Sequence, residues 1–380
     1  MSAGPLTIAE VASKADLARF IRLPARLNAA DRAWITPLVS EQQAAFSAGS
    51  NPFFEHAEVA LWIASRDGRD VGRISAQIDA LAPQDPAGPA GHFGLIAAED
   101  DPQVFARLFE TAEAWLRARG CVKALGPFNL SVNEEVGLLV DGFDTPPMVL
   151  MGHDPPYAGG RIEALGYAKA KDVYAYMGGV ADDLPEPILR RIRRPPGPGV
   201  TLRMVDMKRY DAEVATLTEI LNDAWRGNWG FTPTTEAETR QLAKSLRPVL
   251  DPRLVWFAEI DGEPAGFVAF LPNVNEAIAD LGGRLLPFGW AKLLWRLKVR
   301  GVKSVRVPLM GVRRKFGEGL KGQVLAFRLI DAAASQARAL GYQHCEMSWI
   351  LEDNLPMRRI AEAAGARIYK TYRIYEKALA

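Results

Sequence analysis

The segment SVRVPLMGVRRKFGEGLKGQVLAFRL (304–329) carries the strongest structural signal in the chain. Its first nine residues are mostly apolar and include three valines, which predicts a strand over 304–312. Residues 313–322 hold three glycines and four basic residues, and a helix is predicted to begin near residue 320. A glycine loop between a strand and a helix presents free backbone N–H groups to an anion. The segment is therefore either a phosphate site or a plain turn.

Two well-known phosphate motifs are excluded for this loop. The pattern GxxxxGK[ST] of P-loop proteins is absent. Gly317, Gly319 and Gly322 match the GxGxxG spacing, but no acidic residue follows about 20 residues later at the end of a second strand. A nucleotide-binding loop of either kind is therefore not predicted.

The composition is that of a globular protein with two domains. The chain has 380 residues, of which 48% are hydrophobic and 24% charged, and its formal net charge is +1. This charge excludes a chain that is a nucleic-acid-binding polycation throughout. The two cysteines form no CxxC motif and no disulfide framework, which indicates a reducing compartment. Because neither a signal peptide nor a long apolar run is present, we expect a cytoplasmic protein.

The chain divides at a segment rich in arginine, proline and glycine, RRIRRPPGPG (190–199). We expect one domain over 1–188, a linker over 189–199 and a second domain over 200–380. The two halves resemble each other: WIASRDGRDVG (62–72) and WFAEIDGEPAG (256–266) both predict a hairpin with an Asp-Gly turn. Similar helices, strands and endings follow in the same order, so each half is predicted to be an α/β (α+β) domain with a mixed sheet flanked by helices.

The glycine loop resembles the acyl-CoA pyrophosphate loop of the GNAT acyltransferases. Arg314-x-x-Gly317-x-Gly319 follows a strand and precedes a helix, as in that family. The resemblance covers about residues 200–380 and, more weakly, 1–180, and it implies two GNAT-like domains. It also implies that acyl-CoA is the co-substrate, bound by Met310, Gly311, Val312, Arg314, Lys315, Phe316, Gly317, Gly319, Leu320 and Asn354.

Two positions depart from the family pattern. A tyrosine often follows the family asparagine by seven residues and protonates the departing thiolate, but Ala361 stands there in this chain. The usual Gly-Phe ending is Gly365-Ala366. The N-terminal half has the acidic stretch AAEDDP (97–102) where the C-terminal half has its loop, and these carboxylates would repel a pyrophosphate. The N-terminal domain is therefore interpreted as a degenerate copy that shapes a substrate pocket.

Acylation of an amine needs a base for the ammonium proton and an acid for the thiolate. Glu346 is the candidate base, because it is a carboxylate in a strand near the loop. Tyr372, with Tyr375 as a second choice, is the candidate acid, and Asn354 completes the proposed catalytic set. The histidines show no metal-ligand spacing and no GxSxG elbow is present, so neither a metal site nor a serine nucleophile is predicted.

Two clusters are candidates for contacts with the acceptor substrate. Trp225, Asn228, Trp229 and Phe231 lie in NDAWRGNWGFTPTTEAE (222–238), which borders the acceptor site in GNAT-like proteins. The alternative is that the aromatic residues pack in the core. Asn129, Asn133 and Glu134 lie in GPFNLSVNEEVG (126–137) and form the second cluster, for which a hydrogen-bonded loop is the alternative.

A basic insert over 281–303 is predicted to contain an amphipathic helix. Trp290, Leu293, Leu294 and Leu297 share one helical face, and no acidic residue occurs between 281 and 317. This pattern is typical of a helix that lies in an anionic membrane surface. A core-packed helix with a solvated basic face is the alternative. A membrane contact would make the protein peripheral to the inner membrane.

The stretches SWILEDN (348–354), KTYRIYEKAL (370–379) and GPFNLSVNEEVGLLVDGFDTPP (126–147) resemble the bacterial ceramide synthases. This resemblance implies N-acylation of a long-chain sphingoid base by a fatty acyl-CoA. Two alternatives stay open: an aminoacyltransferase that uses charged tRNA, and a non-catalytic protein that binds acyl-CoA or lipid. The sequence does not determine the acyl chain length, the acceptor, or the oligomeric state.

Overall fold

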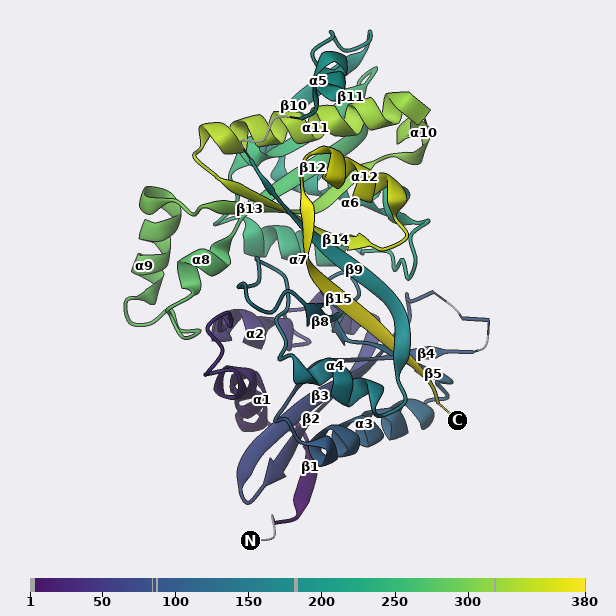
Figure 1. Ribbon diagram of the computed structural model, residues 1–380, viewed down its shortest axis with the longest axis vertical. Coiled ribbons are helices and arrows are strands. Elements are labelled where there is room, and N and C mark those ends of the chain that lie inside the picture. Colours follow the sequence, from purple (N-terminus) through teal and green to yellow (C-terminus); the bar gives the residue numbers. More distant parts are fainter. Residues whose placement is uncertain (1–3, 84, 87, 181–183, 318, 380) are drawn as a thin grey trace. The chain divides into compact units, whose positions relative to one another are not determined.

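The computed structural model describes residues 4–83, 85–86, 88–180, 184–317 and 319–379 (Figure 1). The chain forms two compact units. Unit 1 comprises Met1–Val173, Ile278–Trp290 and Lys370–Ala380, and unit 2 comprises Tyr174–Ala277 and Ala291–Tyr369. Two strands, β9 (Ala168–Gly179) and β15 (Arg367–Ala378), begin in one unit and end in the other.

This division differs from the boundaries predicted from the sequence. Part of the expected linker is helix α5 (Glu186–Ile192), which packs within unit 2 on helix α11 (Gly319–Ala339). Arg328 of α11 donates a hydrogen bond to the carbonyl oxygen of Arg194 at 2.6 Å. The chain's final residues belong to unit 1 instead of the C-terminal domain. The reason is that β9 and β15 carry the chain between the units, so the proline-rich segment is not the point of passage.

Unit 1 contains a mixed sheet with the strand order β1-β2-β3-β4-β5-β15, in which β8 also pairs with β15. Neighbouring strands are antiparallel except β4 and β5, which are parallel. A small ribbon of β6 and β7 is separate. The elements are β1 (Leu6–Glu10), α1 (Lys14–Leu27), α2 (Val39–Ala45), η1 (Pro52–Glu55), β2 (Ala57–Arg66), β3 (Arg69–Asp79), β4 (Ala90–Ala98), α3 (Pro102–Arg117), β5 (Lys123–Gly126), β6 (Phe128–Asn129), β7 (Glu135–Val136), β8 (Leu138–Asp141) and α4 (Tyr157–Glu163).

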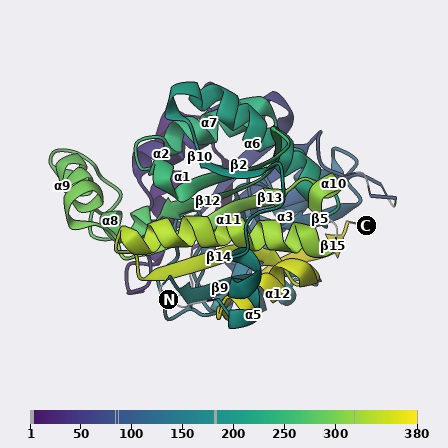
Figure 2. The same cartoon turned by 90° about the horizontal axis from the view of Figure 1, so that it is seen from above.

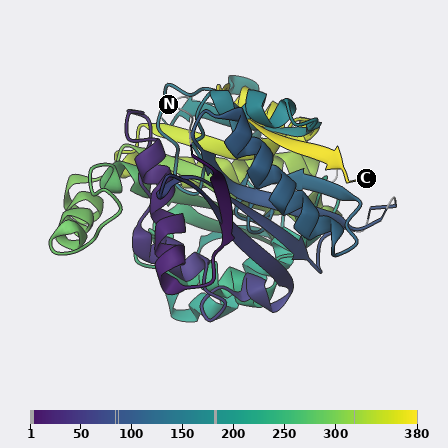
Figure 3. The same cartoon turned by 90° about the horizontal axis from the view of Figure 1, so that it is seen from below.

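Successive side chains of β2 pack on opposite faces of this sheet. Trp62 packs in a cluster with Leu108 of α3, whereas the next residue, Ile63, packs in a cluster with Phe20 of α1. Successive side chains of a strand point to opposite faces. Helices α1 and α3 therefore cover opposite faces, as Figure 3 shows.

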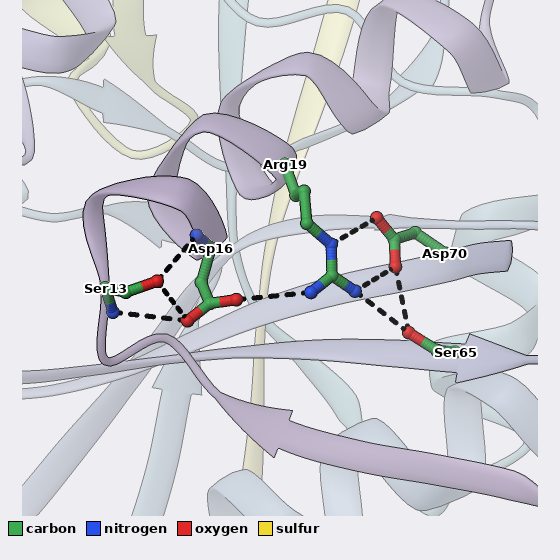
Figure 4. Close-up of polar contacts among 5 residues, drawn as sticks. All are labelled: Ser13, Asp16, Arg19, Ser65 and Asp70. Atoms are coloured by element: carbon green, nitrogen blue, oxygen red, sulfur yellow. Dashed lines mark hydrogen bonds and ion pairs between the residues drawn. The ribbon is translucent and has the colours of Figure 1, made fainter. Parts of the chain in front are cut away.

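A polar network fixes the start of α1 to the first hairpin (Figure 4). Ser13 caps the helix: its hydroxyl accepts from the amide of Asp16 at 3.1 Å, and its own amide donates to the Asp16 carboxylate at 3.2 Å. Arg19, one turn further, donates twice to Asp70 at the start of β3, at 3.1 and 2.5 Å. The hydroxyl of Ser65 also donates to Asp70. The hydrogen bond from Arg19 lowers the pKa of the Asp70 carboxyl.

Unit 2 repeats the architecture with the strand order β9-β14-β13-β12-β11-β10. The pairs from β13 to β10 are antiparallel, and β13 and β14 are parallel. The elements not yet given are β10 (Val200–Met204), η2 (Met207–Arg209), α6 (Tyr210–Trp225), α7 (Glu236–Leu246), η3 (Pro252–Leu254), β11 (Val255–Ile260), β12 (Glu263–Pro272), α8 (Val274–Ile278), α9 (Gly289–Trp295), η4 (Arg296–Arg300), β13 (Ser304–Val312), α10 (Arg314–Gly317), β14 (His344–Leu351) and α12 (Leu355–Ala363).

Helices α6 and α11 cover opposite faces of the unit 2 sheet (Figure 2). Phe267 of β12 packs with Ile220 of α6, and the adjacent Val268 packs with Leu329 of α11. The same alternation continues along β13, where Leu309 packs toward α6 and Met310 toward α11. The expected α/β fold with a mixed sheet flanked by helices is confirmed.

Both predicted Asp-Gly hairpins are confirmed. Strands β2 and β3 are antiparallel and join at Asp67-Gly68, and strands β11 and β12 join in the same way at Asp261-Gly262. Both residues of each turn have positive φ, 51° and 74° in the first and 53° and 79° in the second. Tight hairpin turns of this hand require such values, which glycine adopts without strain.

Strands β13 and β14 separate halfway along their length. Their parallel register ends at the pair Val307 and Met347, although both strands continue. At this point two residues of β13, Val307 and Pro308, lie opposite one residue of β12, Phe270. The extra residue forms a β-bulge in β13. Proline has no N–H for the ladder, and a bulge bends its strand. The sequence VPLMG therefore opens the sheet between β13 and β14.

The insert contains the predicted helix. Helix α9 ends at Trp295 and continues as the single turn η4 (Arg296–Arg300). The residues before it form a loop, because Gly282, Gly283 and Pro287 interrupt a helix. Figure 2 shows α9 standing away from the helices that cover the strands.

Candidate active site

Unit 2 contains a cavity of about 590 Å³ where β13 and β14 separate. Its walls come from β13, β14, α6, α10, α11 and α12, together with α5 and the end of β9. Met310 and Val312 line it from the α11 side of β13, and Trp225 and Asn228 line it from the side of α6. The cavity therefore reaches both faces of the sheet through the gap between the strands.

The glycine loop lies at one end of this cavity. Residues 314–317 form the short turn α10, and α11 begins at Gly319, whose φ is 65°. A β-carbon on Gly322 would lie 2.3 Å from the carbonyl oxygen of Gly317, so the loop folds back against the helix only with glycine at 322. Gly317 and Gly322 both line the cavity. The first turn of a helix of this length has amides without helical partners, and here they lie beside the cavity.

Acidic residues hold two of the basic side chains of the loop. Arg313 donates to Glu219 at 2.9 Å, and Lys315 forms an ion pair with Glu263. The amide of Arg314 donates to Asp223 at 2.7 Å. Within the described part of the chain, the side chains of Arg314, Lys315 and Phe316 are not among those that line the cavity. The side chain of Leu320 lies outside the described residues.

The strand β13 supplies the predicted residues Met310, Gly311 and Val312 to the cavity wall. The indole nitrogen of Trp225 donates to the carbonyl oxygen of Met310 at 3.0 Å. A β-carbon on Gly311 would lie 3.1 Å from that of Ala224, so the absence of a side chain at 311 lets α6 approach the strand. The backbone of β13 is therefore held between α6 and the cavity.

Asn354 lies where β14 turns into α12. Its side-chain oxygen accepts from the amide of Met357 at 3.3 Å and caps α12, and Asn354 also lines the cavity. Seven residues later, Ala361 is fully buried in a cluster with Tyr176 and Ile350. The position at which the GNAT family often has its acidic tyrosine is thus part of the core.

Glu346, the predicted base, is completely buried in a polar cluster. It accepts hydrogen bonds from the hydroxyls of Ser348 and Tyr369, and the Nε of Arg306 lies 3.4 Å from its carboxylate. Arg306 also donates to the hydroxyl of Ser348 at 2.8 Å. Of the described residues, Ser348 lines the cavity whereas Glu346 does not. The sequence reasoning missed Ser348, although its spacing of two from Glu346 placed both on one face of the strand.

Tyr372, the predicted acid, lies in unit 1 and Glu346 lies in unit 2. Tyr372 is buried, and its hydroxyl donates to the carbonyl oxygen of Gly152 at 3.2 Å. The two residues fall in different units because β15 passes from unit 2 to unit 1 after Tyr369. Tyr375, the second choice, donates to Glu163 at 3.1 Å, also in unit 1.

The first acceptor cluster divides in the structure. Trp225 and Asn228 line the cavity, and the ring of Trp225 lies 6.0 Å from that of Trp349 on β14. Trp229 and Phe231 are half-buried and are not among the described residues that line it. The sequence analysis missed Trp349, because nothing in the sequence shows whether an aromatic residue in a strand lines a binding site or packs in the core.

The second acceptor cluster lies in unit 1. Asn129 accepts from the amide of Leu95 at 2.7 Å and donates to Glu135 at 2.8 Å. The amide of Asn133 donates to the hydroxyl of Ser131, and Glu134 is exposed. These contacts are those of a hydrogen-bonded loop, which was the alternative for this cluster.

Two other polar groups occur near this loop in unit 1. The Nε2 of His153 lies 2.8 Å from the carboxylate of Asp31. Burial raises the pKa of Asp154 to about 7, although the amide of Leu139 donates to its carboxylate at 2.9 Å.

The insert exposes large apolar side chains. Leu286, Phe288 and Val299 are 79%, 78% and 72% exposed, and Trp290, Leu294 and Trp295 are about half exposed. Leu293 and Leu297, the other members of the predicted face, are half-buried. Part of the apolar face of α9 is therefore exposed, which disfavours the alternative of a core-packed helix.

Among the described residues, no group of three or more His, Cys, Asp or Glu side chains has the arrangement of a metal site. No helix in the same part of the chain has both the length and the hydropathy to span a bilayer.

Comparison with curated proteins identifies two relatives over nearly the whole chain. The chain is 65% identical over 375 residues to the bacterial ceramide synthase of Caulobacter vibrioides, covering 98% of both proteins. It is 46% identical over 365 residues to protein YghO of Escherichia coli, covering 96% of this chain and 93% of that protein. No protein-family model matches the chain.

Comparison with solved structures gives the fold of both halves. A tandem GNAT protein from the clavulanic acid biosynthesis pathway matches with a TM-score of 0.60 at 12% identity, over 99% of each chain. A GCN5-related N-acetyltransferase from Sphaerobacter thermophilus matches with a TM-score of 0.51 at 13% identity, over 99% of this chain and 97% of that one. The predicted GNAT fold is therefore confirmed.

Proposed function

This chain belongs to the same family as the bacterial ceramide synthase, and we propose that it moves a long-chain acyl group from acyl-CoA to the amine of a sphingoid base. Membership of that family makes it an acyl-CoA-dependent N-acyltransferase. The length of the acyl chain, the lipidic nature of the acceptor and the roles of individual residues are the parts that we propose.

The shape of the unit 2 cavity is the observation that carries the proposal. Small and apolar residues recur every four positions on α11 and line the cavity, namely Gly322, Ala326, Ile330 and Ala334. Twelve residues separate the first from the last, so this stripe is about 18 Å long at 1.5 Å per residue. A cavity that begins at the proposed phosphate-binding loop and continues along such a small and apolar stripe suits a fatty acyl chain better than an acetyl group.

Other walls of this channel also carry apolar side chains. Met357 and Ile360 of α12 pack in one cluster with Ile330 of α11, and all three line the channel. Leu189 and Ile192 of α5 also line it. Burial raises the pKa of the Cys345 thiol, which also lines it, to about 12, so this group is neutral at physiological pH. Each methylene buried in such a channel contributes about 0.8 kcal/mol to binding.

We assign acyl-CoA to the gap between β13 and β14, with its pyrophosphate at the start of α11 and its thioester beside β13. The amides at the start of α11, with Gly317 and Gly319, bind the pyrophosphate. Asn354 contacts the pantetheine arm. The backbone N–H of Met310 polarises the thioester carbonyl, because a donor that is fixed before the reaction stabilises a developing oxyanion.

We assign the acceptor amine to the α6 side of this gap. Trp225 and Trp349 present aromatic faces there, and Asn228 adds a polar group. Aromatic faces attract alkylammonium ions. The long-chain amine therefore meets the thioester between the two tryptophans and β13.

The exposed insert is the proposed contact with an anionic membrane. Trp290, Leu294 and the apolar residues around them face outward beside the exposed basic residues Lys292 and Lys298. Trp and Leu with Lys and Arg is the composition of helices that lie in a lipid interface. Both substrates of the proposed reaction carry long alkyl chains, so an enzyme at the membrane surface reaches them directly.

One alternative function has a specific observation in its favour. The buried Ala361 removes the family's acidic tyrosine, as expected of a protein that binds acyl-CoA without turning it over. The tRNA-dependent alternative is disfavoured, because the basic insert exposes apolar side chains beside its charges.

Product analysis tests the proposal. The purified chain is incubated with palmitoyl-CoA and sphinganine, and the lipid extract is examined by mass spectrometry. The proposal expects the N-palmitoyl amide. Binding of palmitoyl-CoA without formation of any amide would support the non-catalytic alternative. Amide formation that requires charged tRNA would support the tRNA-dependent aminoacyltransferase.

A further inference from the structure

We infer that Ser348 takes the proton of the acceptor ammonium and passes its own hydroxyl proton to Glu346. This inference rests on the proposed function, because it names the base of that reaction. It differs from the sequence-based assignment, in which Glu346 acted on the amine directly.

Ser348 has the position that such a relay requires. It lines the cavity although its side chain is 3% exposed, and it lies in β14 next to Trp349. A serine hydroxyl has one proton to donate and two lone pairs to accept with. Its proton goes to Glu346, and the Nε of Arg306 takes one lone pair at 2.8 Å. The second lone pair is suited to a donor in the cavity.

Glu346 lies behind Ser348. Its side chain is fully buried, and Arg306 and the hydroxyl of Tyr369 contact its carboxylate from other directions. Among the described residues that form the cavity wall, Ser348 is present and Glu346 is absent. A proton that starts on an amine in the cavity therefore reaches this carboxylate through the serine.

The surroundings of Ser348 suit a cation that is about to lose a proton. Trp349 is its neighbour in the chain, and the ring of Trp225 lies 6.0 Å from that of Trp349. A tryptophan face attracts an ammonium ion. The paired rings therefore hold the charged amine beside the hydroxyl that deprotonates it.

The reaction balances as follows. The ammonium gives one proton to the Ser348 oxygen while the serine proton moves to Glu346, which leaves a neutral amine and a protonated carboxyl. The amine nitrogen forms a bond to the thioester carbon, and the carbonyl π electrons move to oxygen. When the carbon–sulfur bond breaks, the thiolate takes the second proton of the nitrogen. The products are the amide and the CoA thiol, and the proton on Glu346 returns through Ser348 to water in the emptied cavity.

Arg306 is a positioning residue in this scheme. It donates to the hydroxyl of Ser348 and, at 3.2 Å, to its carbonyl oxygen, so it fixes the orientation of the serine. Arg306 and Glu346 are 4% and 0% exposed, and removing one partner of a buried ion pair leaves an uncompensated charge. Substitution of either residue would therefore test the fold rather than the relay.

The decisive test substitutes Ser348 and varies the basicity of the acceptor. The wild-type enzyme and Ser348→Ala are compared with a long-chain alkylamine, which is protonated at neutral pH, and with an O-alkylhydroxylamine of equal chain length, which is not. We expect Ser348→Ala to lower kcat for the alkylamine by about 100-fold or more, the usual contribution of a general base. The loss with the O-alkylhydroxylamine is expected to be less than about tenfold, since that acceptor needs no base.

Control measurements separate a relay from a structural role. Ser348→Thr keeps the hydroxyl and is expected to recover most of the activity. If Ser348→Ala does not fold, the wild-type enzyme still gives an answer: a larger solvent deuterium isotope effect on kcat is expected with the alkylamine than with the O-alkylhydroxylamine, because only the alkylamine must first lose a proton through the relay. Equal losses for both acceptors, or equal isotope effects, would overturn the relay. No thiol release by the wild-type enzyme with either acceptor would instead overturn the proposed function, and the relay with it.

Discussion

The indole nitrogen of Trp225, on α6, donates a hydrogen bond to the carbonyl oxygen of Met310, on β13, at 3.0 Å. This bond ties the helix on one face of the unit 2 sheet to the strand edge that lines the cavity. Pairing between β13 and β14 ends at Val307. The β13 residues after Val307 therefore form no ladder hydrogen bonds with β14. Trp225 is thus one of the groups that hold the backbone of β13 in place where the thioester is proposed to bind.

The first prediction concerns this hydrogen bond. Trp225→Phe keeps an aromatic ring but leaves the carbonyl of Met310 without its donor, at a cost of about 1–3 kcal/mol. We expect kcat/KM for acyl-CoA to fall about tenfold or more. Trp229→Phe is the matched control, because it also removes an indole N–H but lies outside the described cavity wall. Equal effects of the two variants on steady-state kinetics would show that the bond has no special role.

The second prediction concerns the glycine loop. A β-carbon on Gly317 would meet its nearest neighbour, the carbonyl oxygen of Val312, at 3.7 Å, so side chains fit there. Gly317→Asp places a carboxylate beside the proposed pyrophosphate, and unit charges about 4 Å apart repel by roughly 4 kcal/mol at an effective dielectric of 20. We expect the Kd for CoA to rise at least about 100-fold, with Tm unchanged because an acid near a helix start is favourable.

Gly317→Ala is the control for this variant and is expected to bind CoA like the wild type. Isothermal titration of CoA measures both variants. Tight binding by the aspartate variant would mean that the pyrophosphate lies elsewhere.

The third prediction concerns the length of the acyl channel. Ala334→Phe fills the channel near its far end, whereas Ser335→Phe adds the same ring at an exposed position one residue away. In Ala334→Phe, kcat/KM for palmitoyl-CoA should fall about fourfold for every methylene that the ring displaces. Octanoyl-CoA should be affected little. A parallel loss for both thioesters, or the same loss in Ser335→Phe, would argue that the acyl chain lies elsewhere.

The fourth prediction concerns pH and stability. Burial raises the pKa of Asp154 to about 7 in the folded chain, from a usual value of 3.8. The folded state therefore holds a proton that the unfolded state has lost, and the stability from this group falls as pH rises from about 4 to about 7. Asp154→Asn imitates the protonated form. We expect its Tm, relative to the wild type, to increase steadily over that interval and to stay constant above pH 7.

Differential scanning calorimetry at pH 5, 6, 7 and 8 measures this difference. Other titrating groups contribute to both proteins and cancel. A difference in Tm that is the same at all four pH values would show that Asp154 is ionised throughout.

The fifth prediction concerns the insert. Phe288→Ser with Trp295→Ser removes two exposed apolar side chains and should leave Tm unchanged. We expect the wild-type chain to sediment with phosphatidylglycerol vesicles and much less with phosphatidylcholine vesicles, and the double variant to lose most of this binding. Lys298→Glu should weaken binding at low salt and have little effect at high salt. Undiminished sedimentation of the double variant would exclude the insert as the membrane contact.

The parts of the fold that follow from local chemistry were predictable from the sequence. The Asp-Gly pairs predicted both hairpins, because few other residues adopt the positive φ of their turns. The glycines and basic residues around Gly317, between an apolar segment and a helical pattern, predicted a loop at the start of α11. Pro308 lies where β13 separates from β14, and a proline within a strand is visible in the sequence.

The rest depends on contacts between residues far apart in the chain. The polar cluster around Glu346 involves Arg306 and Tyr369, which no local pattern connects. The division into units depends on where β9 and β15 run, whereas the proline-rich segment only resembled a linker. Tyr372 was chosen from its strand, but the strand passes into unit 1 before reaching it.

The ratio of kcat/KM for palmitoyl-CoA to that for acetyl-CoA tests the central claim most directly. The measurement follows release of the CoA thiol by the purified chain at saturating sphinganine. Because about 0.8 kcal/mol is gained for each methylene buried in the channel, we predict a ratio of at least about 100. A ratio near one, or a preference for acetyl-CoA, would contradict the assignment of the channel to a long acyl chain.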